Sequence, residues 1–160
     1  MRPYPINEIQ MKSFSHLNDQ GEARMVDVSA KPAQLRKAVA RGEIHLAKST
    51  LDLIQSHQIA KGNVLATARV AGIQAAKKTG ELIPLCHPLP ISHCEVNFEI
   101  PPEQTRIIIN ASATVTAQTG VEMEALTAVA LAALTIYDMC KAVDKSMRIT
   151  EIKLVSKTKS

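Results

Sequence analysis

The chain has 160 residues, of which 46% are hydrophobic and 21% charged, and its formal net charge is +4. An apolar fraction near the globular average and a small net charge exclude a wholly disordered chain, and the length fits one domain. Aromatic residues make up only 2% of the chain. The core must therefore consist of Ala, Val, Ile and Leu side chains, whose small volumes allow helices and strands to pack closely.

Cysteine use and hydropathy bear on the cellular compartment. The three cysteines, Cys86, Cys94 and Cys140, are odd in number and lack C-x-x-C spacing, which favours a reducing, cytoplasmic environment. The start of the chain has no apolar signal region, and the apolar, uncharged run from Ala125 to Tyr137 is too short to cross a bilayer. The basic excess is modest and is unclustered before the C-terminal tail. We therefore expect no membrane span and no nucleic acid partner.

The first part of the chain predicts an arm followed by a strand. Residues 1–22 show no periodicity and contain several turn-forming residues, so we expect a flexible arm before a single domain over residues 23–160. Regular structure is expected to begin within residues 24–29. Residues 35–46 alternate between two kinds of side chain, which predicts a half-buried strand, although their propensities also allow a helix.

Two helices and a hairpin are expected next. Ser49 is a candidate cap for a short helix, and Asn63 is a candidate cap for a second helix that Gly80 would end. Residues 83–90 are rich in proline and exclude a helix, because residues before proline are pushed towards extended geometry. Two alternating runs within residues 96–115 predict a β-hairpin.

The last part of the chain completes the predicted fold. Thr119 and Glu122 have the spacing of a capping box, which predicts a long helix running to about Val143. Residues 147–155 are rich in β-branched and apolar side chains and predict a final strand. From residue 35 onward the order is strand, helices, strand, strand, helix, strand. This order is typical of α+β proteins with a ferredoxin-like fold, in which an antiparallel sheet carries its helices on one face.

The long helix has its charges at its two ends. It carries none from residue 125 to residue 137, so the face turned away from its own sheet would expose an apolar stripe unless a second chain covers it. The charges nearest this run are Glu122 and Glu124 at the start and Asp138 and Lys141 at the finish. The 16 residues from 122 to 138 span roughly 24 Å, so a site that uses both ends needs two subunits.

A purely structural interpretation of these charges stays open. Glu122 is placed as a capping carboxylate, and Asp138 with Lys141 forms an ordinary i,i+3 pair. Glu124 is harder to explain in this way. It lies about 200° around the helix from Glu122, so the two carboxylates meet one ligand only if the first turn is irregular.

Lys61 and His87 are candidates of another kind. Lys61 precedes Asn63 at the positive end of a helix dipole, which indicates a lowered lysine pKa, a bound phosphate, or a solvated loop lysine. His87 lies in the stiff proline-rich loop and can offer one imidazole for hydrogen bonding or proton transfer. The pairs Cys86-His87 and His93-Cys94 lack the spacings of structural zinc sites, so no metal site is expected.

Five blocks of sequence at these positions together resemble one family. They are Met25-Val26-Asp27-Val28-Ser29, Lys61-Gly62-Asn63-Val64 with Ala66-Thr67-Ala68-Arg69, Ile83-Pro84-Leu85-Cys86-His87-Pro88, Thr119-Gly120-Val121-Glu122-Met123-Glu124-Ala125-Leu126-Thr127, and Tyr137-Asp138-Met139-Cys140-Lys141-Ala142. From Gly21 to Val155 the chain closely resembles the cyclic pyranopterin monophosphate synthases of molybdenum cofactor biosynthesis.

The resemblance implies a lyase that converts (8S)-3′,8-cyclo-7,8-dihydroguanosine 5′-triphosphate into cyclic pyranopterin monophosphate and diphosphate. It implies a homo-hexamer of ferredoxin-like subunits, built as a trimer of dimers, with each pocket between two subunits. No cofactor is implied, although a Mg²⁺ ion can accompany the triphosphate.

Family residues can be carried over to this chain by position. The catalytic set is Asp138, Lys141 and Lys61, and the substrate-binding set is Leu85, Cys86, His87, Glu122, Met123, Glu124 and Lys157. We interpret Asp138, Lys141 and Lys61 as an acid–base core, and His87, Glu122 and Glu124 as groups that orient the purine-derived rings. After Lys157 the chain departs from the family, because it ends at Ser160 without the usual glycine-rich stretch.

Two other interpretations compete with this hypothesis. A non-enzymatic ferredoxin-like module could bind nucleotides or RNA through a basic face. RNA binding on a sheet needs aromatic stacking platforms, however, and only Phe98 lies on a predicted strand. A purely structural oligomer would explain the apolar helix but would leave the charges at its ends without a role.

Overall fold

The computed structural model of the chain describes residues 20–160, so almost all of the predicted arm over residues 1–22 lies outside the described residues. The elements are β1 (Gln34–His45), α1 (Lys48–Gln55), α2 (Val64–Lys77), α3 (Thr79–Leu82), β2 (His93–Glu99), β3 (Arg106–Ala117), α4 (Glu122–Cys140) and β4 (Arg148–Lys159).

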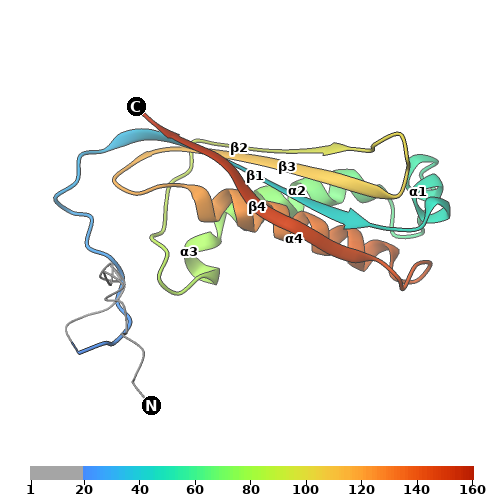
Figure 1. The fold of residues 1–160 in the computed structure, drawn as a ribbon, viewed down its shortest axis with the longest axis horizontal. Coiled ribbons are helices and arrows are strands. Elements are labelled where there is room, and N and C mark those ends of the chain that lie inside the picture. The colour runs from blue at the N-terminus through green and yellow to red at the C-terminus, as the bar shows by residue number, and fades with distance from the viewer. Residues whose placement is uncertain (1–19) are drawn as a thin grey trace, which may run out of the picture.

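The four strands form one antiparallel sheet in the order β2-β3-β1-β4. The long helices α2 and α4 pack against each other and cover one face of this sheet (Figure 1). The predicted α+β, ferredoxin-like fold is confirmed. The predicted hairpin is β2 and β3, and the final strand, β4, runs to Lys159, further than expected.

Strand β1 shows why the alternating pattern of residues 35–46 predicts a strand correctly. Ala38, Ala40 and Ile44 point to the helices and are fully buried. Their partners on β3 in the pairing register are Ala113, Ala111 and Ile107, which are buried on the same face. Small and β-branched side chains from both strands therefore form the surface against which α4 packs.

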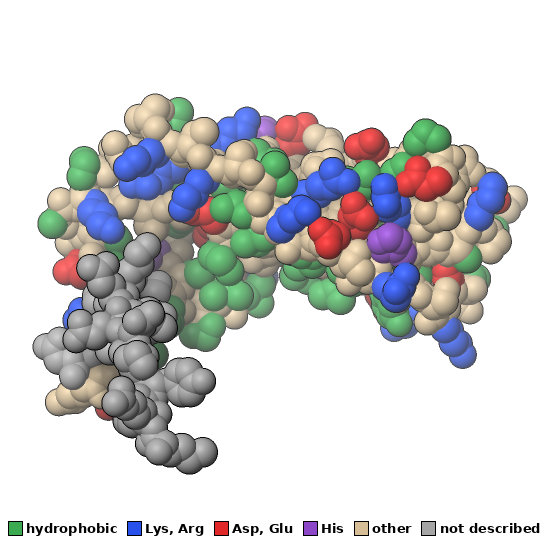
Figure 2. All heavy atoms as spheres, in the orientation of Figure 1, with side chains coloured by type: hydrophobic (Ala, Val, Ile, Leu, Met, Phe, Trp, Pro, Cys, Tyr) green, Lys and Arg blue, Asp and Glu red, His purple; other side chains and the backbone are tan. Residues whose placement is uncertain are grey.

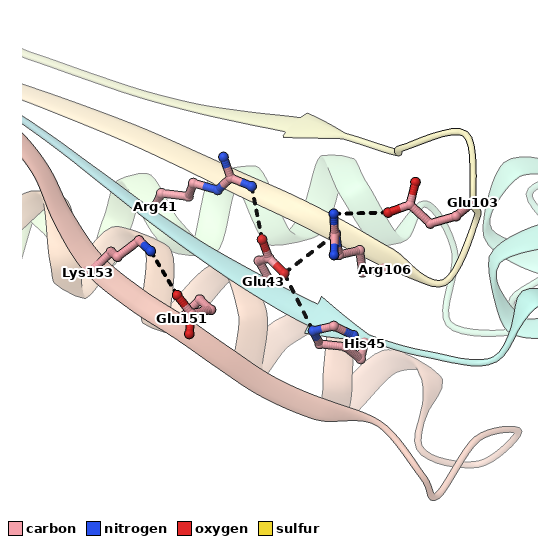
Figure 3. A network of polar contacts seen from close by, with 7 residues as sticks. All are labelled: Arg41, Glu43, His45, Glu103, Arg106, Glu151 and Lys153. Carbon is pink, nitrogen blue, oxygen red and sulfur yellow. Dashed lines mark hydrogen bonds and ion pairs between the residues drawn. The ribbon is translucent and has the colours of Figure 1, made fainter.

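The helix-free face of the sheet carries a network of charges instead (Figure 3). Glu43, on β1, is 8% exposed and accepts a hydrogen bond from Arg41 at 2.9 Å. His45 and Arg106 lie 3.5 and 3.6 Å from the same carboxylate. Neighbouring cations compensate this carboxylate for its loss of water, so we assign the network a structural role.

Of the two predicted helix caps before residue 80, one is wrong and one is confirmed. Helix α1 begins after Ala47, and Ser49 does not cap it. Within residues 20–160 no side chain caps this end; instead the carboxylate of Asp144 binds it from across the fold, accepting hydrogen bonds from the Ala47 amide at 2.8 Å and the Thr50 hydroxyl at 3.2 Å. Asn63, by contrast, caps α2 as predicted, since its side chain accepts from the Ala66 amide at 3.0 Å.

Three boundaries also differ from expectation. Residues 24–29 contain neither helix nor strand, and Val26 and Val28 of this segment line a pocket described below. Gly80 lies within the short helix α3 and does not end α2, which stops at Lys77. The expected capping box at Thr119 and Glu122 is not formed, since α4 has no side-chain cap at its start.

Helix α4 is, by length and composition alone, long and apolar enough to cross a membrane. The helix is longer than the uncharged run over residues 125–137, because it extends past that run to its charged ends. Ten of its residues, among them Ala128, Ala132 and Ile136, are buried in the protein against the sheet and α2. A helix packed in this way is the core helix of a globular domain.

Close packing between α2 and α4 depends on Gly72. A Cβ atom at this position would lie 2.8 Å from the backbone oxygen of Ala128 and 3.2 Å from Val96. We predict that Gly72→Ala lowers the free energy of unfolding by about 1–2 kcal/mol, because the backbone clash outweighs the helix propensity of alanine. Urea denaturation would measure this effect. Gln74→Ala, at an exposed position of the same helix, should change stability by less than about 0.5 kcal/mol. Equal effects of the two variants would contradict the packing argument.

Candidate functional site

The C-terminal end of α4 carries the first group of predicted residues. Asp138 lies in the last turn, Lys141 directly follows the helix, and Lys61 lies just before α2. The two oxygens of the Asp138 carboxylate receive one lysine each: Lys61 Nζ and Lys141 Nζ both lie 2.7 Å away. All three residues are exposed. The structure therefore brings the three predicted catalytic residues together on the surface.

The position of Lys61 is explained by α4, not by the helix that follows it. Its ammonium group also donates to the backbone oxygen of Asp138 at 2.9 Å, at the negative end of the α4 dipole. A lysine charge is disfavoured at the positive end of the α2 dipole. Here the ammonium group lies instead at the negative end of α4, where a positive charge is favoured.

This arrangement stabilises the charged forms of the side chains. Hydrogen bonds from Lys141 and Lys61 lower the pKa of Asp138 to about 2, so it is a carboxylate at neutral pH. The hydrogen bond to Asp138 raises the pKa of Lys141 above its ordinary value. The cluster presents ammonium groups that can donate protons or bind phosphate oxygens.

A pocket of about 620 Å³ lies at the opposite end of α4. Of the residues predicted to bind substrate, six line it: Leu85, Cys86, His87, Glu122, Met123 and Glu124. Most of the other lining side chains are apolar, including Val26, Val28 and Ile83. Apolar walls with a few convergent polar groups are typical of small-molecule sites.

Glu122 and Glu124 both reach this pocket although they are about 200° apart on an ideal helix. Glu122 is the first residue of α4, and its side chain folds back over Gly120 so closely that a Cβ atom there would collide with its carboxylate. The folded-back side chain of Glu122 thus brings both carboxylates to one pocket. Glycine at position 120 was the signal that could have shown this.

The two carboxylates differ sharply in their surroundings. Glu124 is 3% exposed, and its Oε2 atom is buried without a hydrogen-bond partner. Burial raises the pKa of Glu124, and the nearby charge of Glu122 adds to the effect. Burial alone would also raise the pKa of Glu122, but the hydrogen bond from Lys157 at 2.9 Å and the attraction of Arg36 lower it overall. A pair of acids with divided pKa values is typical of acid–base sites.

The buried carboxylate of Glu124 should make stability depend on pH. Because its pKa is higher in the folded chain than the ordinary value of 4.5, the folded state binds the proton more tightly, and stability falls as pH rises above that value. Glu124→Gln carries no charge, so we predict a larger free energy of unfolding than wild type at pH 8 and a difference that shrinks towards pH 4. Urea titrations at several pH values would measure it, with Glu81→Gln at an exposed position of α3 as control. A difference that is constant with pH would contradict the prediction.

His87 contacts the segment that precedes β1, residues 25–31. Its Nε2 atom lies 2.9 Å from the backbone oxygen of Val26, which joins the proline-rich loop to residues 25–31. The neighbouring Cys86 faces the same pocket, and burial raises the pKa of its thiol. Sequence reasoning missed Val26, Val28 and Lys31 as lining residues, because the segment that carries them has no periodicity.

A second, basic pocket of about 330 Å³ adjoins the first. Gly120 and Glu122 line both. The cations around the second pocket are Arg36, Lys37, Lys157 and Lys159. The pairing of β1 with β4, which sets Arg36 opposite Lys159 and Ala38 opposite Lys157, brings them together. Lys157 was predicted from the sequence, whereas Arg36 was missed.

The two ends of α4 remain separate within one chain. Glu122 and Asp138 lie 16 residues apart on a single helix, which corresponds to about 24 Å. Between residues 20 and 160, no group of three or more His, Cys, Asp or Glu side chains is arranged to hold a metal ion. The fold and these sites define an α+β protein with a largely apolar pocket that contains two carboxylates, an adjoining basic pocket and a separate lysine–aspartate cluster.

Comparison with known proteins gives the family. The chain belongs to the MoaC family, which matches residues 25–160. It is 55% identical over 148 residues to the cyclic pyranopterin monophosphate synthase of Desulforapulum autotrophicum, covering 92% of this chain and 91% of that protein. It is 58% identical to the enzyme of the same name from Desulfitobacterium hafniense, covering 91% of this chain and 88% of that protein. For that of Chloroflexus aggregans the identity is 59%, covering 90% and 87%.

Proposed function

We propose that this protein is a cyclic pyranopterin monophosphate synthase, a lyase of molybdenum cofactor biosynthesis that converts the cyclic dihydroguanosine triphosphate into cyclic pyranopterin monophosphate and diphosphate. The observation that carries the proposal is its extensive similarity to relatives of that name over about nine tenths of the chain. The residues carried over from the family also fall into two polar sites at the ends of one helix.

The adjoining pockets support a placement of the substrate. The apolar walls of the larger pocket suit a purine-derived ring, and its carboxylates can accept hydrogen bonds from ring N–H and amino groups. The smaller pocket, with four cations, suits the triphosphate. Because Gly120 and Glu122 line both, one molecule can span them. A Mg²⁺ ion, if it takes part, arrives with the triphosphate.

The lysine–aspartate cluster is the proposed acid–base core. Asp138 positions two ammonium groups, those of Lys61 and Lys141. As ammonium groups they can protonate a leaving oxygen or ring nitrogen and neutralise the charge that develops on phosphate. In this proposal either lysine acts as a base only after its ion pair with Asp138 is broken.

Completion of the site requires a second subunit, and we propose a homo-hexamer built as a trimer of dimers. The cluster and the pocket lie too far apart on α4 for one substrate to touch both in one chain. Apolar side chains are also exposed on α4 and on the adjacent edge strand β4: Met123, Leu134, Ile152, Leu154 and Val155. Figure 2 shows hydrophobic side chains gathered over α4 below the strands. A partner subunit would cover such a surface.

A cytoplasmic location is part of the same proposal. The thiols of Cys86, Cys94 and Cys140 are all free, which suits a reducing compartment.

The RNA-binding alternative has less support than the enzyme. Phe98 packs partly buried against the core, and the Arg69 guanidinium lies 5.6 Å from its ring centre. Since Arg69 belongs to α2, this ring faces the helices and offers no stacking platform on the open face of the sheet.

The test is incubation of the purified protein with the cyclic dihydroguanosine triphosphate and measurement of released diphosphate and pterin product. Diphosphate release in step with pterin formation is the expected result. Binding of the substrate without turnover would favour the non-enzymatic alternative, and neither binding nor turnover would favour the structural oligomer.

A further inference from the structure

The larger pocket contains a polar group that still lacks a partner. Glu124 is only 3% exposed and lines the pocket. Its Oε2 atom is buried and has no hydrogen-bond partner. Glu122 lines the same pocket. An unpaired buried oxygen costs free energy unless a ligand supplies a donor. The side of the pocket formed by Glu122 and Glu124 therefore suits the edge of a ligand that carries N–H groups.

A free cation lines the pocket as well. Within the described residues Lys31 has no ion-pair partner, and among the residues that line the larger pocket it is the only lysine or arginine. It ends the N-terminal segment, residues 25–31, in which a turn is closed by a hydrogen bond of 2.9 Å from the Lys31 amide to the Val28 oxygen. The His87–Val26 contact fixes this segment to the proline-rich loop. Lys31 is thus presented to the pocket by a positioned segment.

The chemistry of these groups matches a guanine-type ring. Such a ring presents N–H and amino donors beside a 6-oxo acceptor, whereas an adenine ring presents a 6-amino donor. Carboxylates satisfy the donors of the guanine type, and an ammonium group satisfies its oxygen. An adenine ring places a 6-amino donor where the guanine type has its oxygen, so the ammonium loses that acceptor and the 6-oxo ring is preferred.

We propose that Lys31 is a specificity-determining residue that donates a hydrogen bond to the 6-oxo oxygen of the guanine-derived ring, while Glu122 and Glu124 receive its N–H and amino groups. This inference rests on the proposed function, because it concerns the ring of that substrate. A phosphate-binding role for Lys31 is disfavoured, because the cations of the basic pocket are four other residues and Lys31 does not line it.

Calorimetric titration of the full chain with GTP, ITP and ATP tests the proposal. These probes share the triphosphate, and only GTP and ITP carry the 6-oxo group. Wild type should bind GTP and ITP more tightly than ATP. Lys31→Met should weaken GTP and ITP by roughly tenfold to a hundredfold, the effect of one hydrogen bond to a charged group, and change ATP by less than about twofold. Lys31→Arg should restore most of the preference.

Lys48→Met is the matched control, because Lys48 pairs with Asp52 on α1 and does not line the pocket. It should leave all three affinities unchanged. Equal weakening of the three nucleotides by Lys31→Met, no weakening, or a wild type without preference for the 6-oxo ring would each overturn the proposal. Diphosphate release by wild type is measured separately. Its absence would refute the proposed function, whereas active enzyme with unchanged nucleotide preference in Lys31→Met would refute this inference alone.

Discussion

Replacing Asp138 with asparagine should lower kcat by about 100-fold to 1,000-fold, the range expected for loss of positioned acid–base groups. The carboxylate now holds Lys61 and Lys141 at 2.7 Å each. A neutral amide cannot balance two ammonium groups, so the lysines would repel each other and leave their positions. Steady-state measurement of diphosphate release would report the effect, and thermal unfolding should confirm an intact fold because Asp138 is exposed.

Asp52→Asn is the matched control for this variant. Asp52 also forms an exposed ion pair with a lysine of its own region, Lys48, at 2.8 Å. It lies on α1 and lines neither described pocket. Its replacement should leave kcat within about twofold of wild type, since exposed ion pairs contribute little. Turnover near wild type in Asp138→Asn would remove the lysine–aspartate cluster from the mechanism.

Mixing the variants Glu124→Gln and Asp138→Asn, each expected to impair turnover by itself, should restore activity if each site draws on two subunits. In Glu124→Gln the pocket end is impaired, and in Asp138→Asn the lysine cluster is impaired. After random co-assembly, half of the pockets carry Glu124 and half of the facing clusters carry Asp138, so about a quarter of the sites are intact. Activity should therefore rise to about a quarter of the wild-type value.

The double variant Glu124→Gln/Asp138→Asn, co-assembled with wild type in equal amounts, is the control. It offers the same fraction of intact sites, about a quarter, under the two-subunit arrangement, but about a half if one chain supplies the whole site. If the first mixture forms mixed oligomers but is no more active than the separate variants, that result would contradict the two-subunit site.

Local sequence was sufficient where neighbours in the chain decide the structure. The alternation in residues 35–46 predicts β1, and the Asn63 side chain caps α2 as its position indicates. It failed where a distant group competes. Asp144, and not Ser49, binds the start of α1, and Glu122 pairs with Lys157 instead of forming a capping box. Propensity and spacing describe only a few residues at a time, so they cannot anticipate such partners.

The sequence by itself determined the order of the elements, the apolar character of α4 and the separation of its charged ends, because periodicity and rise per residue are properties of a local stretch of chain. Its resemblance to a family also indicated most of the site residues. Only the tertiary structure placed Lys61 on Asp138, 77 residues away, and brought Lys31 and Arg36 to the two pockets. Those contacts depend on how helices pack and strands pair, and such long-range geometry leaves no periodic pattern in the sequence.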